Sequence, residues 1–273
     1  MTIVRVCSLW FELPYLQGDW PSLNDRERPR TATATATVVG GNQSLGSSEA
    51  AKVGGMLLTL TGSSCSGKTT LAHALGTRLH GLVVHDHDEI GVPEDADTQW
   101  RHRTTELWIG RALEYQSRGL DLLLTGQSPL GEILASPSAP LLDGIAVCLV
   151  DVADNERRRR LSSRDGDKWS PAVVDAFVGW STWHRGHAED PRYRPDVIVD
   201  GGWPDMSWDR WSAWTKDDPR WETHLLDTTG RSIAQSVDDL EQWVTEQRSA
   251  CRSGRLALSN GWWVTARDSP GTA

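Results

Sequence analysis

The segment from Gly62 to Thr69 constrains this chain more than any other feature. It has the sequence Gly-Ser-Ser-Cys-Ser-Gly-Lys-Thr, which matches the pattern G-x-x-x-x-G-K-[ST] at every position. The apolar run Met56–Leu60 precedes it, and leucines at positions 71, 75 and 79 follow with helical spacing. Glycines in this pattern let backbone amides converge on phosphate oxygens, while a strand before the loop and a helix after it support the amides. The segment therefore predicts a phosphate-binding loop, or P-loop.

Each position of the loop has an expected role. Lys68 places a positive charge at the β- and γ-phosphates of a nucleotide, and the Thr69 hydroxyl holds magnesium. The positive end of the helix dipole adds to the attraction for phosphate. The residues predicted to contact the nucleotide here are Gly62, Ser63, Ser64, Cys65, Ser66, Gly67, Lys68, Thr69 and Thr70.

Five short apolar runs alternate with helical patterns along the chain. Such runs are typical of parallel strands that are buried on both faces. Helix ends are marked by Gly119 after the segment 98–118, by Ser170 with Pro171, and by a capping box of Ser232 and Gln235. The pattern predicts an α/β fold of the P-loop NTPase type, a doubly wound five-stranded parallel sheet with helices on both faces. The predicted strands are Met56–Leu60, Leu82–Val84, Leu122–Thr125, Ala146–Val152 and His224–Leu226, and the last helix is expected to bury Ile233, Val237, Leu240 and Val244.

The ends of the chain differ in composition from the middle. Residues 1–54 contain the repeat TATATAT at 31–37 and a run rich in glycine, serine and asparagine. Residues 1–54 offer too little apolar surface to offset the conformational entropy that the chain would lose on ordering. The composition therefore predicts a disordered leader. The P-loop domain is then expected over residues 55–249, with a tail over 250–273.

Charge and cysteine content limit the possible partners. The formal net charge is −9, which argues against nucleic acid as the main partner. No apolar run approaches the roughly 20 residues of a membrane span, and the N-terminus lacks an apolar signal core. The four cysteines are widely spread without a C-x-x-C pair, so they predict neither a zinc site nor a disulfide framework. A cytoplasmic protein is the default expectation, and its oligomeric state stays open.

Two carboxylates follow the second predicted strand in the run His85-Asp86-His87-Asp88. At the carboxyl edge of a parallel sheet they would face the P-loop. Asp86 is expected to join Thr69 in holding magnesium, and Asp88 to accept a proton from an attacking hydroxyl. His85 and His87 are either metal ligands or, more commonly for loop histidines, hydrogen-bonding residues.

A GTPase of the translational type would need D-x-x-G and then [NT]-K-x-D, in that order. Both strings occur, at 227–230 and 215–218, but in the reverse order. The sequence therefore excludes this class of P-loop protein.

The order of these motifs resembles that of the small P-loop kinases, a family that includes shikimate kinase, gluconate kinase and chloramphenicol phosphotransferase. The matching segments are GSSCSGKTT at 62–70, DHD at 86–88, an arginine-rich segment at 157–164 and LDTTGRS at 226–232. The resemblance spans roughly residues 55–247. It implies a five-stranded core, ATP and Mg²⁺ as cofactors, and phosphorylation of a hydroxyl on a small molecule.

An arginine-bearing lid is expected over about 154–170. In the transition state of phosphoryl transfer, negative charge is spread over the oxygens of the transferred group. Catalysis therefore needs cations near these oxygens. Arg160 and Arg164 lie four residues apart on one helical face, and we expect Arg160 to contact the nucleotide and Arg164 to act in catalysis. A solvated helix face is the expected place of Arg157, Arg158 and Arg159.

The sequence departs from the family pattern in a tryptophan-rich segment. Eight of the 15 tryptophans lie between Trp169 and Trp221, and an insertion is predicted over about 196–221. This segment is expected to form either a cap that stacks on substrate or the core of a small added subdomain. We slightly favour a core position for most of its indoles. His184 and His187 on the preceding helix are expected to contact substrate or to lie on the helix surface.

Substrate contacts are also predicted at two places near the sheet edge. Gln127 follows the third strand, and Arg103, with Arg101, begins the next helix, where it could clamp an anionic substrate. Two alternatives to a small-molecule kinase stay open. One is a kinase of polynucleotide ends, and the other is a non-catalytic ATP sensor.

Overall fold

The computed structural model describes residues 55–263. The predicted leader, 1–54, and the end of the tail, 264–273, lie outside the described residues. The strands are β1 Leu57–Thr61, β2 Leu82–Asp86, β3 Asp121–Thr125, β4 Ile145–Asp151 and β5 Thr223–Asp227. The helices are α2 Lys68–Gly76, α3 Thr98–Ser117, α4 Leu130–Ala135, α5 Asp154–Asp165, α6 Pro171–Glu189, α7 Asp196–Val199 and α8 Ile233–Arg252, with short 3₁₀ turns η3 His87–Ile90, η4 Ala139–Leu141 and η5 Trp208–Arg210.

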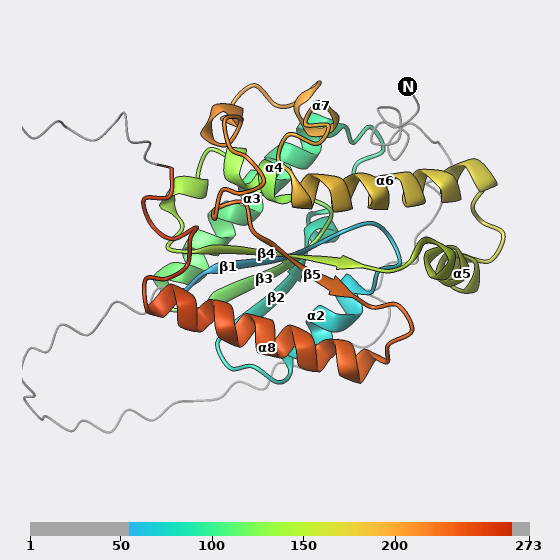
Figure 1. Cartoon of the computed structure of the whole chain (residues 1–273), viewed down its shortest axis with the longest axis horizontal. Helices are drawn as coiled ribbons and strands as arrows, with labels where there is room; N and C mark the ends of the chain where they lie inside the picture. The colour runs from blue at the N-terminus through green and yellow to red at the C-terminus, as the bar shows by residue number, and fades with distance from the viewer. Residues whose placement is uncertain (1–54, 264–273) are drawn as a thin grey trace, which may run out of the picture.

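The five strands form one sheet in the order β2-β3-β1-β4-β5, and every neighbouring pair is parallel. β1 lies at the centre, so the loop that follows it opens at the middle of the carboxyl edge (Figure 1). All five strands carry the apolar runs that predicted them. The doubly wound five-stranded α/β fold is thereby confirmed.

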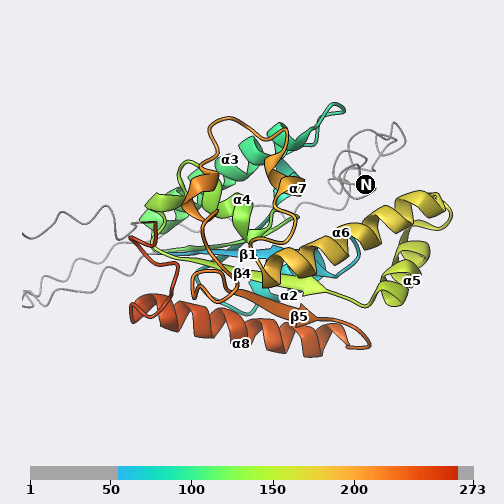
Figure 2. The ribbon, with the colours of Figure 1, turned by 45° about the horizontal axis from the view of Figure 1, so that its top comes forward.

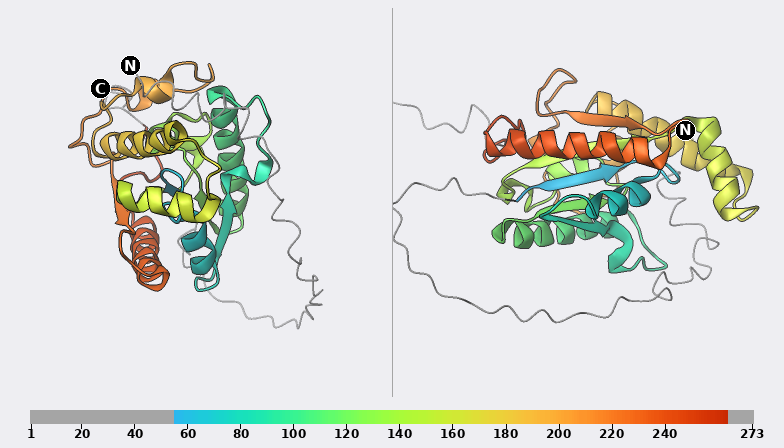
Figure 3. Two further views of the ribbon diagram at one scale, coloured as in Figure 1. Left: turned by 90° about the vertical axis from the view of Figure 1, so that its right-hand side faces the viewer. Right: turned by 90° about the horizontal axis from the view of Figure 1, so that it is seen from below.

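Helices cover both faces of the sheet (Figures 1 and 3). On one face α2 and α8 pack over a core that contains Leu58 and Leu60 of β1. On the other face α3, α4 and α6 cover a core that contains Leu57. Successive residues of a strand point to opposite faces, so one apolar run supplies both cores.

The helix ends agree with the capping signals of the sequence. The Ser170 side chain accepts from the backbone amide of Val173, and Ser232 and Gln235 form a capping box at the start of α8. Val237, Leu240 and Val244 are buried as predicted, but Ile233 is 58% exposed. Ile233 is the first residue of α8, directly after the N-cap Ser232, and its side chain stays in solvent at this helix end.

The tryptophan-rich segment packs on the face that carries α3, α4 and α6 (Figure 2). Trp211, Trp214 and Trp221 are buried there, each at most 6% exposed. Packed structure also continues beyond residue 249, because Leu258 and Trp262 join the same core. Among residues 55–263, no helix has the length and apolar character needed to cross a membrane.

Candidate functional site

The loop after β1 has the backbone shape that its glycines permit. Gly62 and Gly67 have φ of 132° and 104°, and Cys65 has φ of 61°. Positive φ is easily adopted by glycine and costs a side-chain-bearing residue free energy, so Cys65 is held there by its surroundings. α2 begins at Lys68 directly after Gly67, which places the amino end of a helix at the loop. This is the strand, loop and helix that the sequence predicted.

Lys68 folds back over its own loop. Its Nζ donates to the carbonyl oxygens of Gly62 at 2.7 Å and Ser63 at 3.0 Å. Burial, together with the nearby charge of Arg157, lowers the pKa of Lys68 to about 8, while Asp86 and Asp88 act in the opposite direction. The ammonium group is thus held at the loop, where a phosphate group would compete for it.

Thr69 and Asp86 meet as predicted. The Thr69 hydroxyl donates to Oδ2 of Asp86 at 2.9 Å, and the Thr125 hydroxyl donates to the same oxygen at 2.6 Å. Asp86 and Thr125 are paired residues at the carboxyl ends of β2 and β3. The sheet therefore places the Asp86 carboxylate beside the first turn of α2.

These oxygen donors fit Mg²⁺. In nucleotide sites this ion is held by one or two protein oxygens together with phosphates and water, and not by a cage of protein ligands. The residues from 55 to 263 contain no cluster of three or more His, Cys, Asp or Glu side chains that would suit a different metal. The Thr69 hydroxyl and the Asp86 carboxylate, 2.9 Å apart beside the predicted phosphate-binding loop, are oxygen ligands of the kind that Mg²⁺ prefers.

Asp88 lies in the turn η3, just after Asp86. Its backbone amide donates to Oδ1 of Asp86 at 3.1 Å, and its side chain is 57% exposed. The flanking histidines have structural partners. His85 contacts Glu89 at 2.6 Å and the Tyr115 hydroxyl at 2.9 Å, and buried His87 contacts Thr105 at 3.2 Å. The hydrogen-bonding role expected of loop histidines is the one the structure supports.

Of the two predicted lid arginines, Arg160 reaches the P-loop. It lies 3.4 Å from the carbonyl oxygens of Cys65 and Ser66, and it also donates to Thr228. Arg164 is exposed at the end of α5 and pairs with Asp165 at 2.7 Å. The structure brings Arg160, and not Arg164, into contact with the loop.

The expectation for Arg157 is wrong. This side chain is fully buried and donates to the carbonyl oxygen of Ser64 in the P-loop. It also donates to Asp151 at 2.5 Å and to Ser181 at 2.9 Å. Burial lowers the pKa of Arg157, and Asp151 opposes that shift. Arg158 and Arg159 do lie on the solvated face and pair with Asp175 and Glu156.

Two further residues at the loop were missed from the sequence. The Thr228 hydroxyl is 3.0 Å from the carbonyl oxygen of Ser66, and Asp151 ends β4 beside the loop. Asp151 could have been found, because it is a carboxylate at the end of an apolar strand and thus at the carboxyl edge of the sheet. Thr228 lies in the segment LDTTGRS at 226–232 that carries the family resemblance, but nothing in that pattern assigned a role to this residue.

Of the predicted substrate residues, Arg103 and its neighbour Arg101 pair with residues outside this cluster, whereas Gln127 lies at its sheet edge. Arg103 is exposed on α3, donates to Gln99 at 2.9 Å and lies over the Trp203 ring. Arg101 is buried and pairs with Glu132, and its charge, with that of His102, outweighs burial and lowers the pKa of Glu132 to about 2. Gln127 is half-buried directly after β3, at the same sheet edge as Asp86.

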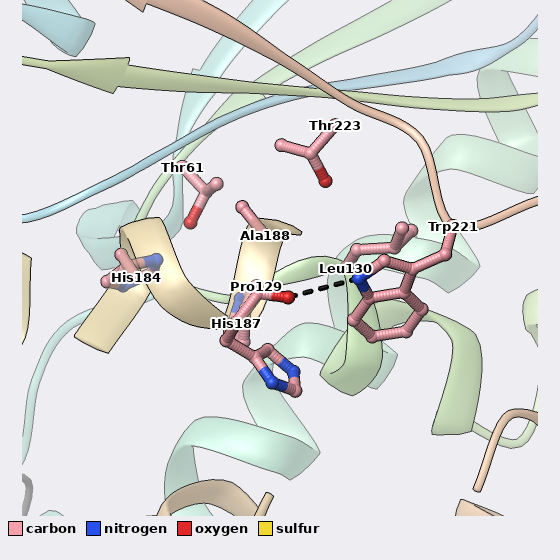
Figure 4. A pocket seen from close by; sticks show the side chains of 8 residues that line it. All are labelled: Thr61, Pro129, Leu130, His184, His187, Ala188, Trp221 and Thr223. Atoms are coloured by element: carbon pink, nitrogen blue, oxygen red, sulfur yellow. Dashed lines mark hydrogen bonds between the residues drawn. The ribbon is translucent and has the colours of Figure 1, made fainter. Parts of the chain in front are cut away.

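His184 and His187 are buried, which corrects the expectation of a helix surface. Both Nε2 atoms lack a hydrogen-bond partner, and so do the Thr61 and Thr223 hydroxyls. All four residues line one small cavity between the sheet and α6 (Figure 4). The Trp221 indole donates to the backbone oxygen of His187 at 3.0 Å, which ties the tryptophan-rich segment to α6. Most of these indoles are core residues, the interpretation that the sequence slightly favoured.

Comparison with known proteins gives similarity in structure alone. No family model matches the chain, and no curated protein sequence matches it. Solved structures with a related arrangement include a sugar kinase from Janibacter sp., with 15% identity and a TM-score of 0.46 over 71% of this chain and 97% of that one. A thymidylate kinase from Candida albicans has 12% identity and a TM-score of 0.43, over 73% and 94% of the two chains. A gluconokinase from Sinorhizobium meliloti has 15% identity and a TM-score of 0.38, over 71% and 98%.

TM-scores below 0.5 and identities of 15% or less do not indicate which reaction this chain catalyses. What supports a function is the set of contacts among the P-loop, Asp86 and the arginines of α5.

Proposed function

We propose that this chain is an ATP-dependent phosphotransferase that transfers the γ-phosphoryl group to a hydroxyl of a small molecule. The contact of 2.9 Å between the Thr69 hydroxyl and the Asp86 carboxylate carries the proposal. It joins the predicted phosphate-binding loop after β1 to the carboxyl end of β2, where a second carboxylate, Asp88, follows two residues later. A nucleotide-binding loop with a paired acidic strand end is the minimal arrangement for moving a phosphoryl group to a hydroxyl.

The P-loop amides and Lys68 would bind the phosphates of ATP. Thr69 and Asp86 would hold Mg²⁺, which neutralises charge on the β- and γ-phosphates when it is bound. Lys68 donates to the carbonyl oxygens of Gly62 and Ser63, and it would exchange these contacts for phosphate oxygens when a nucleotide binds.

Asp88 is the proposed base. Its exposed carboxylate follows Asp86 by two residues in the turn η3, where an acceptor could reach it from solvent. It would accept the proton of the acceptor hydroxyl as the oxygen attacks the γ-phosphorus. Arg164 is proposed to leave Asp165 and stabilise negative charge on the transferred group.

Replacement of Asp88 by Asn tests the proposed base. The amide keeps the shape of the side chain and cannot accept the proton, so kcat should fall by about a hundredfold or more. Affinity for MgATP should stay unchanged, as measured by calorimetry. Asp95→Asn, an exposed change in the following loop, is the matched control and should keep wild-type kcat. An Asp88→Asn protein with full phosphotransfer would contradict the mechanism.

A further inference from the structure

Five consecutive carbonyl oxygens of the P-loop, from Gly62 to Ser66, each face a cationic side chain. Three side chains supply these contacts, one from the loop itself and two from α5. Lys68 donates to Gly62 and Ser63, Arg157 donates to Ser64, and Arg160 lies at 3.4 Å from Cys65 and Ser66. We call these three residues the cationic collar.

The collar determines which way the loop amides point. In a trans peptide the carbonyl and the following N–H lie in one plane and point in opposite directions. The carbonyl groups of Ser64, Cys65 and Ser66 are held outward, toward Arg157 and Arg160 of α5, and this turns the N–H groups of the next residues away from α5. Converging N–H groups form a concave anion site, and here they are oriented before any phosphate arrives.

Of the three side chains in the cationic collar, Arg157 is the one that is fully buried. Its side chain is 0% exposed, and burying a charge costs free energy unless partners compensate. Asp151 and Ser181 provide that compensation at 2.5 and 2.9 Å, and Arg185 binds the other Asp151 oxygen at 2.9 Å. One guanidinium group thus links the end of β4, α6 and the backbone of the loop.

The neighbours of Arg157 show that this is a specific placement and not a property of the whole arginine run. Arg158 and Arg159 have side chains that are 46% and 72% exposed, and each pairs with a surface carboxylate. Exposed pairs of this kind contribute little to stability. Within the run, Arg157 combines full burial with a contact to the P-loop.

We propose that Arg157 is a positioning residue, which holds the Ser64 carbonyl outward so that the P-loop is already shaped for phosphate in the free protein. This inference rests on the proposed binding of ATP at the loop. Arg157 touches neither nucleotide nor acceptor, and it acts through the backbone. Loss of the side chain should weaken nucleotide binding without changing the phosphoryl-transfer step itself.

Arg157→Ala tests the proposal, with Arg158→Ala as the matched control from the same helix. Loss of a charge-assisted hydrogen bond should weaken MgATP binding by about tenfold or more, as measured by calorimetry. Amide hydrogen exchange across residues 62–69 should accelerate in Arg157→Ala, while exchange in β3 and α8 stays unchanged. Methylguanidinium, at a concentration too low to unfold the chain, should fill the space left by the side chain and restore binding. Arg158→Ala should behave as wild type in all three measurements.

Arg157→Ala leaves Asp151 with fewer partners and can lower stability on that account. The double variant Arg157→Met with Asp151→Asn removes both buried charges and keeps the volume, and it should show the same loss of affinity. Wild-type affinity and wild-type loop exchange in either folded variant would overturn the proposal. A wild-type chain that binds no MgATP overturns both this inference and the proposed function. Binding that Lys68→Ala abolishes but Arg157→Ala leaves intact overturns the inference alone.

Discussion

At the start of the phosphate-binding loop, Gly62 occupies a position that tolerates no side chain. Its φ is 132°, and a Cβ atom there would lie 2.4 Å from the backbone oxygen of Val150. A backbone oxygen at the end of β4 cannot move aside without disturbing the sheet. The second residue that constrains the loop is Gly67, which has positive φ but open space around it.

Gly62→Ala should therefore destabilise the chain more than strain at positive φ alone would do. Gly81 is the matched control, because it has φ of 74° and a Cβ atom added there would meet no other atom within 4 Å. Gly81→Ala should cost about 1 kcal/mol and Gly62→Ala roughly 2–4 kcal/mol in the free energy of unfolding. Urea denaturation of both proteins measures the difference. Equal costs would show that the loop shifts freely away from β4.

Arg157 is a residue whose place could not be predicted from its type. The run from Arg157 to Arg160 consists of four identical residues, and residue type alone assigns all four to solvent. The position of Arg157 on its helix indicates burial instead. Leu161 is buried one helical turn after Arg157, so both lie on the face of α5 that turns toward the loop. That spacing was the available signal. The Thr69–Asp86 contact, in contrast, was predicted from the P-loop motif and from the place of Asp86 at the end of the second predicted strand.

Among the elements, α6 connects the P-loop to the tryptophan-rich segment. The backbone oxygen of Phe177 accepts from the Ser63 hydroxyl, and the His187 oxygen accepts from Trp221. Its buried face includes Phe177, Trp180, His184 and His187, spaced by three or four residues. The start of α6 was predictable from Ser170 and Pro171. Burial of its histidines was not, because residue type placed them at the surface while the helical period placed them inside.

Burial of His187 makes the stability of the chain depend on pH. Burial lowers the pKa of His187 to about 4, against the opposing effects of the Tyr193 carbonyl, Glu132 and Asp190. Burial also lowers the pKa of His184, with the charge of Lys68 acting in the same direction. A histidine whose folded pKa lies below its unfolded value binds its proton first in the unfolded chain. Stability is therefore full above pH 6.5 and falls as the pH drops from 6.5 toward 4.

The titration of His187 should lower the free energy of unfolding by about 3 kcal/mol between pH 7 and pH 4. Thermal unfolding between pH 7 and pH 4, compared in wild type and His187→Gln, measures it. The variant should have lower stability at pH 7 and a shallower decline in acid. Parallel curves would mean that His187 does not titrate in this window.

The tryptophan-rich segment is expected to behave as core. Trp211 is 2% exposed, and its indole donates to the Gly131 backbone oxygen at 2.8 Å. Trp211→Phe should lower the free energy of unfolding by about 1–3 kcal/mol, through lost volume and an unpaired carbonyl group. Half-buried Trp208 is the control, and Trp208→Phe should cost less than about 1 kcal/mol. A segment that only caps substrate would show equally small effects for both changes.

In the whole molecule, the parallel sheet brings distant segments to one edge. β1, β2, β3 and β4 end there, so residues near positions 62, 86, 125 and 151 meet although they are far apart in the chain. This much followed from alternating strands and helices. The sequence did not predict that the tryptophan-rich segment, α6 and the pair Leu258 and Trp262 share one core. Such packing depends on contacts between distant segments, which no local sequence pattern indicates. The substrate contact expected of Arg103 likewise depends on a contact that no local sequence pattern fixes, and it stays a prediction.

The proposed reaction is the transfer of a phosphoryl group from ATP to a hydroxyl. The most direct measurement follows ADP release from ATP labelled at the γ-phosphate, with magnesium, across a panel of hydroxyl-bearing metabolites, and identifies the labelled product. We predict that one chemical class of small alcohols, sugars or nucleosides stimulates ADP release and carries the label, and that Lys68→Ala abolishes both. Tight MgATP binding without transfer to any acceptor, or label that appears only on polynucleotide ends, would contradict the account.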